Sequence, residues 1–253
     1  MELADQTNQL PAVAFLGASR GLGHQVLLSW QKSFPGTKNI RVARQFKKME
    51  TSIFESRENV EVLNWEVDFS KQEQWAGFLE KLISHKVQKI FYFAGGGPYG
   101  GYATKQTSVP SDKWPSQSWS HHVSFLFPAF LIHHGLSHFQ QMVFVGSSVA
   151  EIRPDPYAAM YCASKHGLKG LIQSVQKEAE QGKGFTDLRL FSPGYMDTDL
   201  LPKNAWPRIN PPEGEKIHDP GQVAQIFCDF VSDAGQANQN MRMPPFQSFL
   251  TPG

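Results

Sequence analysis

The sequence predicts an α/β protein in which a mostly parallel sheet lies between two layers of helices. Short apolar runs typical of buried strands alternate along the chain with longer segments of helical spacing. A glycine-rich turn joins the first such strand to the first helix, as in the βαβ units that build parallel sheets. No linker divides the 253 residues, so we expect a single domain with one full core.

Six apolar runs are predicted to form strands, at residues 12–16, 39–43, 60–65, 89–94, 142–145 and 188–191. Helical segments are expected at residues 26–30, 72–84, 119–139, 161–175 and 221–232. The last helix is marked by Asp219, a good N-cap, and by Pro220 at the first helical position. We expect the strand order 3-2-1-4-5-6, with a possible short seventh strand.

The composition argues against several classes of protein. Lys and Arg number 24 against 23 Asp and Glu, so the net charge of +1 does not favour nucleic acid as a partner. Cys162 and Cys228 form no C-x-x-C motif and fit a reducing compartment better than a disulfide scaffold. The first nine residues are polar, and no apolar run reaches membrane-spanning length. We therefore expect a soluble cytoplasmic protein.

The first predicted strand leads directly into the glycine-rich turn. Gly17 permits a tight turn, Gly21 lets the backbone approach a pyrophosphate, and Gly23 allows the helix to pack closely. The N–H groups at the start of the helix then face the phosphates. Arg44 follows the second strand, where an arginine accommodates the 2′-phosphate of NADP. The turn therefore predicts a dinucleotide site that favours NADP(H).

A second chemical feature follows the fifth predicted strand. Tyr161 and Lys165 are four residues apart on a helix, so they share one face, and the ammonium is expected to lower the pKa of the phenol. A serine at the strand end, Ser148 or Ser147, is placed to hold a carbonyl oxygen beside that phenol. Such a pair also occurs in helices without any catalytic role, so it gains meaning only beside a cofactor site.

Other features allow a structural or a functional interpretation. Asp68 is suited to cap the helix of residues 72–84. Gly95 and the glycines after it would either turn the chain or let a nicotinamide ribose lie on the backbone. His134 and His138 have a chelating spacing but no carboxylate to complete a metal site, so no metal is expected. The proline-rich segment 195–220 is either a substrate-binding lid or a static surface loop.

Four motifs, in this order and spacing, resemble the short-chain dehydrogenase/reductase family over residues 11 to 200. They are Gly17-Ala18-Ser19-Arg20-Gly21-Leu22-Gly23, then Ala94-Gly95, then Ser148 with Tyr161-Cys162-Ala163-Ser164-Lys165, and finally Ser192-Pro193-Gly194 with Thr198. The resemblance implies a Rossmann domain, hydride transfer between NADPH and a carbonyl or the reverse, and a homodimer or homotetramer. It implies that Ser148, Tyr161 and Lys165 are catalytic.

The resemblance also implies where the cofactor is held. An aspartate at the place of Asp68 commonly lies against the adenine, and basic residues at the places of Arg20 and Arg44 go with NADP(H). The complete set of expected contacts is Gly17, Ser19, Arg20, Gly21, Leu22, Gly23, Arg44, Asp68, Ala94, Gly95, Tyr161, Lys165, Pro193, Gly194 and Thr198.

The chain departs from the family pattern at two places. Tyr92-Phe93-Ala94-Gly95 replaces the usual Asn-Asn-Ala-Gly, and His122-Val123 stands where many relatives have an asparagine of the proton relay. These departures leave open an NADP(H)-binding sensor or scaffold with little catalysis. The same fold also carries isomerases and dehydratases. The retained Ser148, Tyr161 and Lys165 favour the carbonyl reductase, because a sensor has no need for them.

Overall fold

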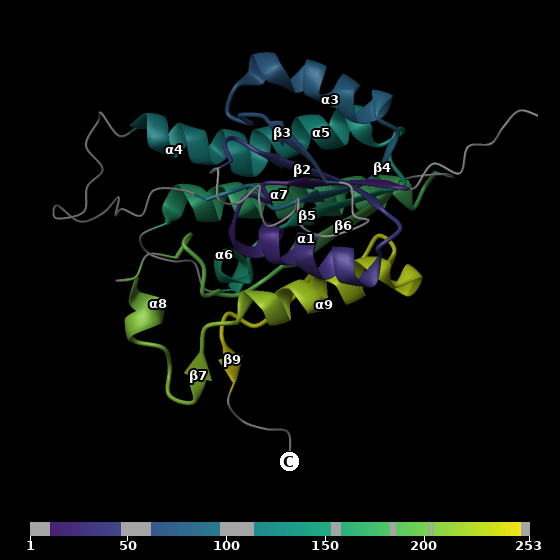
Figure 1. The fold of residues 1–253 in the computed structure, drawn as a ribbon. Helices are drawn as coiled ribbons and strands as arrows, with labels where there is room; N and C mark the ends of the chain where they lie inside the picture. The colour runs from purple at the N-terminus through teal and green to yellow at the C-terminus, as the bar shows by residue number, and fades with distance from the viewer. Residues whose placement is uncertain are drawn as a thin grey trace, which may run out of the picture.

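The computed structural model describes residues 11–46, 62–96, 114–152, 158–182, 186–201, 203 and 205–248. Parallel strands form a seven-stranded sheet in the order β3-β2-β1-β4-β5-β6-β8 (Figure 1). Their bounds are β1 (Ala12–Leu16), β2 (Lys38–Ala43), β3 (Val62–Glu66), β4 (Val87–Tyr92), β5 (Gln141–Val145), β6 (Asp187–Ser192) and β8 (Asn240–Arg242). The expected order is confirmed, and β8 is the short seventh strand.

Helices cover both faces of this sheet (Figure 1). One face carries α3 (Trp75–Ser84), α5 (Phe127–Gly135) and α7 (Ala159–Ala179). The other carries α1 (Gly21–Ser33) and α9 (Pro220–Ser232). The three-layer α/β/α architecture is therefore the one that the sequence predicts. In the described part of the chain, no helix combines the length and apolarity that crossing a bilayer requires.

The central strands are apolar throughout because both of their faces are covered. In β1, Ala14 and Leu16 point into the core beneath α5 and α7, whereas Val13 and Phe15 point into the core above α1 and α9. All of β1 is buried, so a polar side chain in this strand would cost free energy because it would be removed from water. This continuous apolar run ends at Gly17, which places the glycine-rich turn at the carboxyl edge of the sheet.

Several element boundaries differ from the expectations. β4 ends at Tyr92, because the N–H groups of Phe93 and Ala94 both donate to Leu16 O and carry the chain over the end of β1. The first two residues of the expected third strand, at positions 60 and 61, lie outside the described residues. The apolar stripe of α7 packs on the sheet, with Leu168 and Ile172 completely buried.

The expectation that Asp68 caps the helix of residues 72–84 is wrong. That segment is a short 3-10 turn, η1 (Gln72–Gln74), followed by α3, and neither has a side-chain cap. The Asp68 carboxylate instead accepts hydrogen bonds from the backbone N–H and the hydroxyl of Ser70, at 3.0 and 2.7 Å. The aspartate thus closes a local turn and leaves its other face toward the cavity described below.

Two other segments are more structured or less regular than predicted. The segment 119–139 is not one α-helix, because α4 (Trp114–His121) passes into the π-helical turn η3 (His122–Leu126) before α5 begins. The segment 195–220 contains a short helix, α8 (Trp206–Ile209), and a strand, β7 (Glu215–Lys216). β7 pairs antiparallel with β9 (Gln247–Ser248) outside the main sheet. Asp219, which follows β7 in the chain, caps α9 as expected.

Candidate active site

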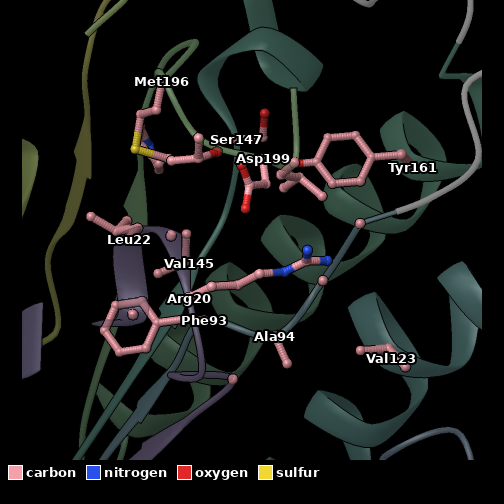
Figure 2. Close-up of a pocket in the computed structure, with 18 of the residues that line it drawn as sticks. Arg20, Leu22, Phe93, Ala94, Val123, Val145, Ser147, Tyr161, Met196 and Asp199 are labelled. Carbon is pink, nitrogen blue, oxygen red and sulfur yellow. The ribbon is translucent and has the colours of Figure 1, made fainter. Parts of the chain in front are cut away.

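A cavity of about 320 Å³ lies at the carboxyl ends of the central strands. Its walls come from the turns after β1, β4, β5 and β6, and from α7 (Figure 2). β1 and β4 are neighbours in the sheet, but the chain continues from β1 to β2 on one side and from β4 to β5 on the other side. Parallel sheets bind their ligands at such a switch point.

The glycine-rich turn forms one wall of the cavity. Gly17 has φ of +87°, and a Cβ atom there would lie 2.4 Å from the backbone nitrogen of Ala94. A Cβ atom on Gly23 would lie 2.8 Å from Gly17 O. Both positions therefore require glycine for steric reasons. α1 begins without a side-chain cap and without an acid in its first turn, so its start is suited to an anion.

Arg41 supports this turn from beneath and was not identified from the sequence. Its side chain is completely buried in β2, with Nε donating to Ala18 O at 3.0 Å and Nη2 donating to Ser19 O at 3.2 Å. The available signal was an arginine in the middle of an otherwise apolar strand, because a buried charge needs fixed partners. Here the guanidinium holds two carbonyls of the turn in place.

Arg20 and Arg44 both line the cavity and are exposed. Arg20 extends from the glycine-rich turn across the cavity (Figure 2). The Arg44 guanidinium lies 5.8 Å from the centroid of the Trp119 ring, which lines the same cavity. Asp68 and Thr198 are also in the lining. The two arginines are thus the cations that the glycine-rich turn and the end of β2 present to a ligand.

Tyr161 and Lys165 share one face of α7, as their spacing predicts, and both line the cavity. Lys165 is 2% exposed, and its Nζ donates to Val145 O at 2.7 Å. Burial lowers the pKa of Lys165 to about 8. Burial also raises the pKa of Tyr161 to about 12, with a hydrogen bond to Ser147 acting in the opposite direction.

The expected lowering of the tyrosine pKa is therefore absent from this structure. The Lys165 Nζ lies 5.8 Å from the centroid of the Tyr161 ring and is directed at a backbone carbonyl of β5. The ammonium is itself destabilised by burial, so it has little charge to offer the phenol above pH 8. Desolvation of the phenol then decides the direction of the shift.

The two serines after β5 occupy different environments. Ser147 lines the cavity with Tyr161. Ser148 is completely buried at the start of α6 (Ser148–Ile152), and its hydroxyl donates to Pro193 O at 3.1 Å. Ser148 does not belong to the cavity lining. Its catalytic role stays a prediction from the family motif, while the geometry favours Ser147.

The two departures from the family pattern meet behind the cavity. The hydroxyl of Tyr92 donates to Val123 O at 2.6 Å and ties β4 to η3. His122 is outside the lining, and its Nδ1 lies 2.8 Å from Ser118 O.

A Cβ atom added to Gly95 would lie 3.1 Å from Lys165 Nζ and 3.3 Å from Ser124 Oγ. Ser124, which the sequence analysis did not single out, is therefore the η3 side chain near Lys165.

The other predicted cofactor contacts also converge on this cavity. Ser19, Leu22, Ala94, Gly95, Pro193, Gly194 and Thr198 all belong to its lining. Within the described residues, no group of three or more His, Cys, Asp or Glu side chains is arranged to hold a metal ion.

Comparison with solved structures shows the same fold across nearly the whole chain. A short chain dehydrogenase from Burkholderia cenocepacia J2315 in complex with NADP is 15% identical, with a TM-score of 0.77, covering 94% of this chain and 98% of that one. An alcohol dehydrogenase from the archaeon Thermococcus sibiricus, complexed with 5-hydroxy-NADP, is 18% identical, with a TM-score of 0.74 and coverage of 96% and 99%. A 4-hydroxyisoleucine dehydrogenase complexed with NADH gives a TM-score of 0.73 at 17% identity, with coverage of 93% and 97%.

Sequence comparison adds one curated relative and a family. Mouse (Mus musculus) 15-hydroxyprostaglandin dehydrogenase [NAD(+)] is 38% identical over 55 residues, a stretch that spans 22% of this chain and only 20% of that protein. The family model described as short chain dehydrogenase matches residues 11–207. The chain therefore belongs to the short-chain dehydrogenase family of oxidoreductases.

Proposed function

We propose that this protein is an NADP(H)-dependent oxidoreductase that interconverts a carbonyl and an alcohol. One observation carries the proposal: Tyr161, Lys165 and Ser147 line the same cavity as the glycine-rich turn and its arginines. A protein that only bound a nucleotide would need the turn but not a phenol, an ammonium and a hydroxyl beside it.

The cavity fits a dinucleotide with a 2′-phosphate. Gly17 and Gly23 leave no room for a side chain, and the uncapped start of α1 suits the pyrophosphate. Arg20 and Arg44 supply two cations at the places where a 2′-phosphate is bound in Rossmann domains. Of the three compared structures, one holds NADP, one holds 5-hydroxy-NADP and one holds NADH, so this preference rests on the two arginines.

Bound NADPH would supply the hydride. Tyr161 is a protonated phenol at neutral pH, as an ordinary tyrosine is, and burial raises its pKa further, to about 12. It donates that proton to the carbonyl oxygen. The Ser147 hydroxyl orients the same oxygen. Lys165, as an ammonium, would stabilise the phenolate that forms and would hold the ribose hydroxyls of the bound nucleotide. A homodimer or homotetramer in the cytoplasm is part of the same proposal.

The second candidate is an NADP(H)-binding sensor with little turnover. The position of His122 favours it, because this side chain is turned toward Ser118 and away from the cavity. Both candidates predict nucleotide binding. They differ in whether any carbonyl compound makes the protein oxidise NADPH.

The proposal is tested by titrating the purified protein with NADPH and NADH while following nicotinamide fluorescence. Wild type should bind NADPH more tightly, and Arg44→Ala should lose roughly tenfold in NADPH affinity while NADH affinity stays unchanged. Lys177→Ala removes a positive charge from the far end of α7 and serves as the matched control. If neither nucleotide binds, the dinucleotide site is not there.

The catalytic assignment is tested with the same proteins and a panel of aldehydes and ketones. Tyr161→Phe should retain NADPH binding and lose turnover by at least about a hundredfold, because the proton donor is gone. Turnover that survives in Tyr161→Phe contradicts the role of the tyrosine. A wild type that binds NADPH but oxidises it with no compound of the panel supports the sensor.

A further inference from the structure

The turn that follows β6 touches two walls of the cavity. Thr198 N donates to Met196 O at 2.9 Å, and Leu201 N donates to Thr198 O at 3.1 Å, which closes the turn. The Thr198 methyl group lies 3.8 Å from the place that a Cβ atom on Gly21 would take. Leu200 Cδ1 lies 2.9 Å from the corresponding place on Gly96. Residues 198–201 thus reach from the glycine-rich turn to Gly96, in the loop after β4.

Backbone hydrogen bonds tie the residues just before this turn to neighbouring segments of the chain. Tyr195 N donates to Pro245 O at 2.8 Å, and His218 N donates to Tyr195 O at 2.7 Å. Asp197 N donates to His218 O at 3.0 Å. These bonds hold residues 195–197, of which Tyr195 and Met196 also line the cavity, and none of them reaches residues 198–201.

Arg208 of α8 provides the attachment of the turn itself. Its Nη2 donates to Thr198 O at 2.9 Å, and its Nε donates to Leu201 O at 3.1 Å. Its Nη1 pairs with the Asp197 carboxylate. A guanidinium presents these donors in a planar fork of fixed geometry, so one side chain spans the whole turn from residue 197 to residue 201.

The hydrogen bonds from Arg208 to the carbonyl oxygens of Thr198 and Leu201 should hold the turn more strongly than the ion pair with Asp197 does. The Asp197 side chain is 62% exposed, and an ion pair in that setting contributes little because water screens it. The Arg208 side chain is only 20% exposed, so its bonds to the two carbonyls are better protected from water. Removing the fork therefore frees a turn that bears Thr198, whereas removing the Asp197 charge leaves the fork in place.

We propose that Arg208 is a positioning residue for the cofactor: it locks residues 198–201 in the shape that brings Thr198 and Leu200 over the nucleotide. This inference rests on the proposed NADP(H) site. Arg208 lies outside the cavity lining, so it acts through the turn and does not touch the nucleotide. Its loss should loosen the bound nucleotide mainly by speeding its release, since the freed turn no longer holds the nucleotide in place while the other walls of the cavity remain.

The test measures NADPH binding and release by nicotinamide fluorescence and stopped-flow displacement. Arg208→Ala should raise the dissociation constant roughly tenfold, mainly through a faster dissociation rate. Arg208→Lys keeps the charge but loses the fork, so it should remain closer to Arg208→Ala than to wild type. Asp197→Asn should stay within about twofold of wild type. Lys177→Ala is the matched charge control.

The possible outcomes distinguish a failure of the positioning role of Arg208 from a failure of the proposed NADP(H)-dependent function. If wild type binds NADPH and both Arg208 variants bind and release it like wild type, the positioning role is wrong and the proposed function stands. If Arg208→Lys recovers full affinity, charge rather than the fork is what counts, and the inference also fails. If wild type binds no nicotinamide nucleotide, both are overturned. Arg208→Lys carries the test if Arg208→Ala does not fold.

Discussion

Tyr161 and Lys165 respond to burial in opposite directions. The phenol keeps its proton far above neutral pH, whereas the ammonium has lost half of its protons near pH 8. Both shifts have the same cause, which is that burial disfavours the charged form of each group. At pH 7 the pair is therefore a neutral acid beside a cation, which suits reduction of a carbonyl.

NADPH affinity should depend on the charge of Lys165. If the proposed site is right, the ammonium present below pH 8 would attract the ribose hydroxyls and the phosphates of NADPH, and the neutral amine above that pH would do so weakly. The dissociation constant for NADPH should therefore rise between pH 7 and pH 9, measured by fluorescence titration. Lys165→Met should bind weakly and show no such rise. An identical rise in both proteins would assign the pH dependence to another group.

The two serines offer a matched pair of variants. Ser147→Ala removes the hydroxyl in the cavity and should reduce kcat by roughly tenfold or more while NADPH binding is kept. Ser148→Ala removes a buried hydrogen bond to Pro193 O, so it should lower the free energy of unfolding by about 1 kcal/mol with a smaller effect on kcat. Steady-state kinetics and urea unfolding of both variants check this. The opposite pattern would restore Ser148 to the role that the family motif implies.

At the scale of elements, one buried carboxylate joins three of them beside the cavity. The Glu151 side chain of α6 is 3% exposed and pairs with Lys169 of α7 at 3.1 Å. It also accepts a hydrogen bond from Ser192 at the end of β6, at 2.5 Å. α6 follows directly after Ser147, and this cluster fixes α6 against α7 and β6.

Breaking this cluster should have an asymmetric cost. Lys169→Met leaves the Glu151 carboxylate buried without its cation, which should cost roughly 3 kcal/mol of unfolding free energy. Glu151→Gln leaves Lys169, which is 28% exposed and can turn toward water, so about 1 kcal/mol is expected. Urea unfolding followed by circular dichroism measures both. A larger loss for Glu151→Gln than for Lys169→Met would contradict this account.

At the scale of the whole molecule, two apolar cores hold the sheet from either side. One is rich in aromatic rings, with Phe127 stacked on Phe69 at a centroid distance of 4.4 Å. The other joins α1 and α9 to the sheet, with Phe227 set edge-on to Phe91 at 5.3 Å. The compared structures share this architecture at 15 to 18% identity. Patterned burial, and not particular residues, therefore maintains the fold.

Much of the fold could be read from patterns within short windows. The apolar run of β1 and the glycine-rich turn are local signals, because burial on both faces and a positive φ each restrict the residue types directly. The ends of helices and strands were harder to predict from the sequence. β4 stops at Tyr92 because the next two N–H groups cross to Leu16 O, a contact between residues more than seventy positions apart. The Asp68 cap failed because a nearer partner, Ser70, takes the carboxylate.

The sequence by itself determined the α/β/α layers, the strand order, the family and, apart from Ser148, the predicted site residues that line the cavity. Each of these depends on periodicity, glycine sterics or the order and spacing of motifs, all of which can be followed along the chain without knowing which distant residues touch. Only the tertiary structure decided that Ser147 faces the cavity, that Arg41 supports the glycine-rich turn and that Arg208 grips the turn after β6. The pKa of Tyr161 belongs to the same group. Its direction depends on how completely the surrounding elements exclude water, and no spacing of charges along the chain records that.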